Sequence, residues 1–74
     1  MTIELTTEEK IGVINTHLRN LAVNKYNVQL SIMEEESKNV PNPVLLGNYN
    51  EQINQIDQAA VVLDTQLANL QASN

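Results

Sequence analysis

Cysteine is absent from this sequence of 74 residues, and there is only one histidine. Without cysteine the chain has no disulfide framework, and a zinc site built from cysteine and histidine is excluded. A chain of this size has a marginal hydrophobic core, so one without disulfides or zinc depends on very regular helix packing or on oligomerisation. The sequence therefore predicts a structure that is held together by contacts between helices.

Aromatic residues, glycine and proline are also scarce. The chain has two tyrosines, two glycines and two prolines, and no phenylalanine or tryptophan. Its core must be built from leucine, isoleucine, valine and alanine, while asparagine and glutamine are abundant outside it. The low content of glycine and proline favours long helices over sheets and turns, so the predicted fold class is all-α.

Basic residues are few, and the net charge is −5. A nucleic-acid-binding protein needs a basic footprint that replaces counterions, and this chain has none, so we expect no nucleic-acid partner. An anionic membrane surface is disfavoured for the same reason, and the longest apolar runs, AAVVL and VLL, are far too short to span a bilayer. The segment MTIELTTEEK carries acids where a signal peptide carries bases, so we expect cytoplasmic localisation.

The first half of the chain has the spacing of an amphipathic helix. Thr6 followed by Glu9 matches a capping box, which predicts a helix over residues 6–37 after an arm at 1–5. Apolar residues then recur alternately three and four residues apart, which is a heptad pattern with one polar member, Lys25. This stripe consists of Ile11, Ile14, Leu18, Leu21, Lys25, Val28 and Ile32.

The second half repeats the pattern after a segment that contains both prolines. Pro41 ends the first helix, and Asn42 and Pro43 suit the cap and first position of a second helix at 43–71. Residues 38–42 are thus a hinge within a single domain of residues 1–74, and residues 72–74 are a frayed end. The second stripe consists of Leu46, Tyr49, Ile53, Ile56, Ala60, Leu63, Leu67 and Leu70.

The two stripes coincide layer by layer when the chain is folded back at the hinge. Ile11 then lies opposite Leu70, and Ile32 lies opposite Tyr49. This register predicts an antiparallel two-helix hairpin with a coiled-coil-like seam. Lys25 lies opposite Ile56, and its side chain is expected to reach Asp57 and to help fix the register.

A second group of apolar residues lies on the opposite side of the first helix. We call it the outer patch; it consists of Val23, Tyr26, Leu30 and Met33. Exposed contiguous apolar patches mark contact surfaces, so we expect the hairpin to self-associate as a homodimer or higher oligomer, most simply as a four-helix bundle. The patch could instead bind another protein, or rotation of the first helix could bury some of its residues within the hairpin.

No residue pattern typical of catalysis is present, and we predict no catalytic residues, no cofactor and no metal site. His17 has no acidic helical neighbour and is interpreted as a structural or solvated residue. The acidic run Glu34–Glu36 is interpreted as a solvated charge run, compensated in part by Lys38 and by the start of the second helix. The alternative is that this run docks on a basic protein partner, which would make the chain an acidic regulatory binding module rather than a structural one.

The run LTTEEKIGVINTHLRNLAVNKYNVQLSIMEEE, followed by PNP and a second helix rich in glutamine and asparagine, resembles small uncharacterised helical proteins of tailed marine phages. The resemblance extends over nearly the whole chain and rests on its overall residue pattern rather than on a diagnostic motif. It implies a viral origin, a location in the host cytoplasm or the virion, and a structural or assembly role.

Overall fold

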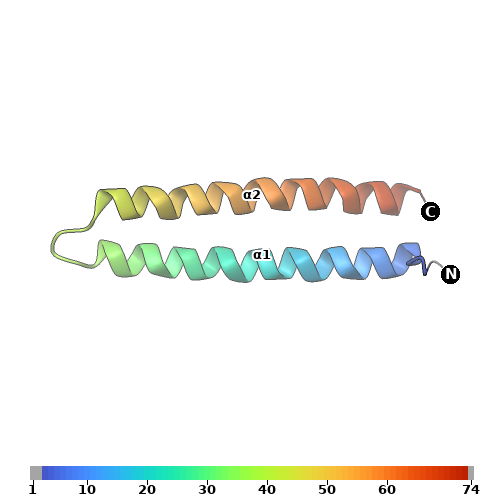
Figure 1. Cartoon of the computed structure of the whole chain (residues 1–74), viewed down its shortest axis with the longest axis horizontal. Helices are drawn as coiled ribbons and strands as arrows, with labels where there is room; N and C mark the ends of the chain where they lie inside the picture. Colours follow the sequence, from blue (N-terminus) through green and yellow to red (C-terminus); the bar gives the residue numbers. More distant parts are fainter. Residues whose placement is uncertain (1–2, 74) are drawn as a thin grey trace.

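The computed structural model describes residues 3–73, which form two long helices joined by a short hinge. Helix α1 spans Thr7–Glu36 and helix α2 spans Pro43–Ala72. The helices lie side by side and run in opposite directions, with both chain ends at one end of the molecule and the hinge at the other (Figure 1). All regular secondary structure in this part of the chain is helical. The predicted all-α hairpin is therefore confirmed.

The start of α1 is fixed by the expected capping box. The backbone N–H of Glu9 donates to the Thr6 hydroxyl at 3.1 Å, and the backbone N–H of Thr6 donates to a Glu9 carboxylate oxygen at 3.0 Å. Thr6 itself has extended backbone angles, so α1 begins one residue later than predicted. The reciprocal bonds satisfy two backbone donors that the first turn of a helix leaves free.

The start of α2 also follows the sequence prediction. The side-chain oxygen of Asn42 accepts hydrogen bonds from the backbone N–H groups of Val44 and Leu45, and Pro43 occupies the first helical position. At the other end α2 includes Ala72, one residue beyond the predicted end, and Ser73 is its C-cap. Residues 3–5 of the predicted arm have no regular secondary structure. Residues 1–2 of the arm and Asn74 of the predicted frayed end lie outside the described residues.

The seam between the helices contains both predicted stripes. Every stripe residue is buried or half-buried, and the most buried of them is Ile14, with 9% of its surface exposed. No side chain in the described part of the chain is fully buried. A single seam between two helices thus gives a core that is one layer thick and open along both sides.

The shape of the molecule is a rod rather than a sphere. It measures 58 × 20 × 18 Å and has a radius of gyration of 17.1 Å, whereas a compact chain of this length has a radius of gyration of about 11 Å. Its accessible surface of 5730 Å² exceeds the roughly 4,600 Å² expected for a compact monomer of the same mass. The hairpin therefore leaves roughly 1,100 Å² more surface in water than a typical folded monomer.

Candidate interaction surfaces and hinge

The outer patch lies on α1, away from α2. Three of its four members are well exposed: Val23 at 51%, Tyr26 at 59% and Met33 at 60%. Leu30 is half-buried, although its position in the heptad faces away from the seam. The alternative in which rotation of α1 buries some of these residues inside the hairpin does not apply to the three exposed side chains, which remain available to a partner.

Two neighbouring valines of α2 are exposed. Val61 is 63% exposed and Val62 is 67% exposed. Adjacent residues of a helix point about 100° apart at ~3.6 residues per turn, so the two side chains lie on different faces of α2. With the outer patch, they give the hairpin apolar surface on more than one side.

One ion pair connects the two helices at mid-length. The Lys25 ammonium lies 2.8 Å from the Asp57 carboxylate and donates a hydrogen bond to it. The predicted contact between these residues is confirmed, and it agrees with the predicted register, in which Lys25 lies opposite the preceding residue, Ile56. Because the pair is largely exposed, its contribution to stability is about 0–1 kcal/mol. We expect the pair to favour this alignment of the helices over a shifted one.

The hinge is closed by a buried carboxylate, that of Glu35. Only 4% of the Glu35 surface is exposed. One of its carboxylate oxygens accepts a hydrogen bond from the backbone N–H of Asn42 at 2.9 Å, and the other accepts one from the Lys38 ammonium at 2.9 Å. The last turn of α1 thereby holds both the hinge and the N-cap residue of α2. We call this arrangement the hinge clamp.

The clamp shifts the pKa of both charged groups in the direction that favours their charged forms. The hydrogen bond from the Asn42 N–H, and then that from Lys38, hold the pKa of Glu35 below its ordinary value, against the opposing effect of burial. The hydrogen bond to Glu35, together with its negative charge, raises the pKa of Lys38. Both groups are thus ionised at neutral pH.

The interpretation of Glu34–Glu36 as a solvated charge run is wrong for its middle residue. Glu34 and Glu36 are exposed, as expected, but Glu35 faces the hinge and is bonded there. The sequence carried a signal for this, because Glu35 follows Ile32 by three residues and so continues the heptad stripe of α1. The expected compensation by Lys38 and by the start of α2 is present, and both partners act on Glu35.

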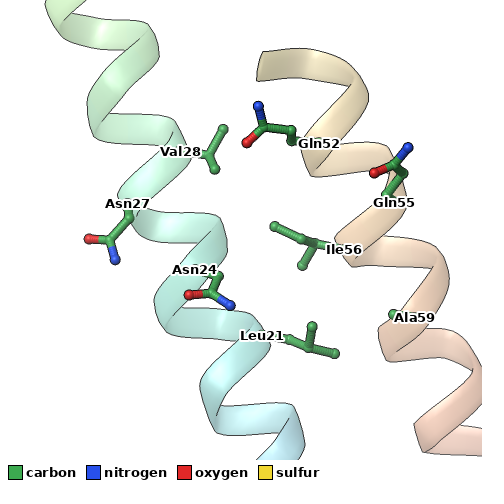
Figure 2. Close-up of a pocket in the computed structure, with 8 residues that line it drawn as sticks. All are labelled: Leu21, Asn24, Asn27, Val28, Gln52, Gln55, Ile56 and Ala59. Carbon is green, nitrogen blue, oxygen red and sulfur yellow. The ribbon is translucent and has the colours of Figure 1, made fainter. Parts of the chain in front are cut away.

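An open groove of about 450 Å³ lies along one side of the seam. Leu21, Val28 and Ile56 point into the space between the helices, while Asn27 and Gln55 lie on the outer edges of α1 and α2 (Figure 2). The eight lining residues are three aliphatic residues, four side-chain amides and one alanine: Leu21, Asn24, Asn27, Val28, Gln52, Gln55, Ile56 and Ala59. None of them is charged, so the groove is suited to apolar groups and to neutral hydrogen-bonding groups.

The groups that could support metal binding are dispersed. Within residues 3–73, no three histidine or acidic side chains lie close enough together to hold a metal ion. His17 is exposed, in agreement with its interpretation as a solvated residue. Neither helix in the described part of the chain is both long and apolar enough to cross a membrane.

No family model, no curated protein and no solved structure matches the chain.

Proposed function

We propose that this chain is a non-enzymatic structural module that self-associates through the outer patch of α1, most simply as a homodimer that forms a four-helix bundle. The observation that carries the proposal is the exposure of Val23, Tyr26 and Met33 on a hairpin that has no fully buried side chain in residues 3–73. A chain with so thin a core gains stability by burying such a surface against another molecule.

The size of the exposed surface supports this proposal. A specific interface buries about 800 Å² on each partner, and the hairpin exposes roughly 1,100 Å² more than a compact monomer of its mass. Each square ångström of apolar surface removed from water contributes about 25 cal/mol. An interface of that size would remove most of this excess surface from water on each hairpin.

A structural role also agrees with the resemblance to helical proteins of tailed phages, which implies a part in assembly. An acidic module that docks on a basic protein is the second candidate. The exposure of Glu34 and Glu36 favours it, but Glu35 is bonded within the chain and is not available to a partner. The two functions differ in their salt dependence, because exposed charge pairs are screened by salt and apolar contacts are not.

The test is the double variant Tyr26→Asp/Met33→Asp, compared with the parent by sedimentation at one protein concentration. Both side chains are exposed and lie seven residues apart on one face, so two carboxylates would have to be desolvated in the proposed interface. We expect a lower mass than that of the parent, with little change when salt is raised.

The matched control is Asn54→Asp/Thr65→Asp, which adds the same charge at two exposed positions on the outer side of α2. We expect this variant to keep the mass of the parent. The proposal is contradicted if the Tyr26→Asp/Met33→Asp variant keeps the mass of the parent, or if the control dissociates to the same extent.

A further inference from the structure

The groove is a charge-free surface on an acidic protein. The chain has a net charge of −5, yet none of the eight residues around the groove is charged. Two copies of an acidic chain repel each other least when the surfaces that face each other carry no charge. The groove satisfies that condition over about two turns of each helix, and the outer patch satisfies it on α1.

The amides around the groove make this surface complementary to itself. Asn24, Asn27, Gln52 and Gln55 each carry both a donor and an acceptor in the side chain. None of the hydrogen bonds found among residues 3–73 involves these side-chain amides. A two-fold symmetric interface brings the same patch of both subunits together, so it requires groups that can bond to their own kind. Amides meet this requirement, whereas a patch of one charge does not.

An exposed apolar side chain lies next to the groove on the same side of α2. Val62 follows Ala59 by three residues and Gln55 by seven, and residues at these spacings share a helix face. It is 67% exposed, so its isopropyl group projects where it can enter an apolar recess. The floor of the groove, formed by Leu21, Val28 and Ile56, is such a recess (Figure 2).

We infer that the groove is an interface with a second copy of this chain, in which Val62 of each copy enters the groove of the other. The two-fold axis passes near Ala59, where a small side chain allows the two α2 helices to approach closely. By symmetry, each copy both provides Val62 and receives it. The inference rests on the proposed self-association but assigns it a second face, separate from the outer patch.

The consequence is an assembly larger than a dimer. A chain with one two-fold interface forms dimers, whereas a chain with two different two-fold interfaces forms a closed tetramer or an extended array. The two surfaces adjoin along α1 at Asn27, but the interface proposed in the groove is centred on Ala59 of α2, and the outer patch lies on α1 alone. The parent is thus expected to sediment as a tetramer or larger species.

The experiment compares Val62→Asp with Val61→Asp by sedimentation of the full chain. The two substitutions are chemically identical, adjacent in sequence and nearly equal in exposure, at 67% and 63%, but they lie on different faces of α2. We expect Val62→Asp to lower the mass of the assembly by half or more, and Val61→Asp to keep the parental mass. Ala59→Arg, which places a bulky charge at the rim of the groove with a good helix former, is expected to act like Val62→Asp.

The results separate this inference from the proposed function. If both Val62→Asp and Ala59→Arg keep the parental mass while Tyr26→Asp/Met33→Asp lowers it, the groove interface is overturned and the outer patch stands. If the groove variants lower the mass and the outer-patch variant does not, the groove stands and the proposed role of the outer patch fails. Equal losses from Val61→Asp and Val62→Asp overturn the inference, because added charge rather than position would then disrupt the assembly. A monomeric parent overturns both.

Discussion

Ile14→Ala is expected to lower the free energy of unfolding by about 2 kcal/mol, at the low end of the range for replacing a buried isoleucine with alanine. Ile14 is the most buried apolar residue of the described chain, with 9% of its surface exposed. The loss has two parts, the transfer of buried methyl groups to water and the cavity that they leave. The seam is open at its sides, so neighbouring side chains can partly fill the cavity, and this places the expected loss at the low end.

The control is Val13→Ala, at the adjacent position on the exposed surface of α1. We expect this change to alter the free energy of unfolding by no more than about 0.5 kcal/mol. Denaturant unfolding followed by circular dichroism gives both values, and it must be done at one protein concentration because association stabilises the folded state. Equal losses from Ile14→Ala and Val13→Ala would contradict the seam as the source of stability.

Glu35→Gln is expected to lower the melting temperature more than Glu34→Gln or Glu36→Gln. Glutamine has nearly the same shape as glutamate but no charge, so it weakens the hydrogen bonds that Glu35 accepts from Lys38 and from the Asn42 N–H. It also introduces amide hydrogens into a site that is occupied by two donors. Glu34 and Glu36 are exposed, so their substitution is expected to have a small effect.

The same clamp is expected to make stability fall at acid pH. Because the folded-state pKa of Glu35 lies below its unfolded value, the unfolded chain binds the proton more readily. The contribution of Glu35 is complete above its unfolded pKa and is lost as the pH falls through the folded one. The contribution of Lys38 to stability changes with pH in the opposite direction. Its pKa is raised, so its contribution is complete below the unfolded pKa and is lost as the pH rises through the folded pKa. Melting temperatures measured across the pH range test both the loss of stability at acid pH and the loss at alkaline pH.

In the Glu35→Gln variant, stability should fall less steeply at acid pH than in the parent, but it should still fall. The pKa of Glu9 is also lowered, chiefly by the hydrogen bond from the backbone N–H of Thr6, and that carboxylate remains in the variant. Suppose that Glu35→Gln melts at the same temperature as Glu34→Gln, and that its stability falls at acid pH as steeply as that of the parent. This result would show that the hinge clamp does not contribute to stability.

Most of the fold could be predicted because local and long-range signals in the sequence agree. The caps at Thr6 and Asn42 mark where the two helices begin. The two heptad stripes then specify which faces meet and in which direction. The Lys25–Asp57 contact was predictable from the register. The start of α1 shifted by one residue because the cap residue Thr6 has extended backbone and is not itself part of the helix. The end of α1 lies one residue before the predicted one, and the end of α2 lies one residue after it.

The burial of Glu35 is not predicted from the stripe, whose one polar member is Lys25 and whose last apolar residue is Ile32. Glu35 occupies the next seam position after Ile32. Its burial depends on the partners that the hinge brings to it, namely the Asn42 N–H and the Lys38 ammonium. The path of the hinge backbone is not encoded in periodicity, so the hydrogen bonds could not be derived from spacing alone.

The outer patch was predicted as a set, but the degree of exposure of each member was not. Val23, Tyr26 and Met33 are exposed, whereas Leu30 is half-buried. The groove was not predicted at all. It depends on how far apart the two helices are held by their seam residues, and heptad spacing fixes the order of the layers without giving that distance.

The measurement that tests self-association most directly is the mass of the parent chain by light scattering across a dilution series, with helix content measured by circular dichroism on the same samples. The account predicts an oligomer at high concentration that loses helix only as it dissociates, since the open seam and the exposed outer patch give the isolated hairpin little stability. A chain that remains a fully helical monomer at every concentration would contradict self-association.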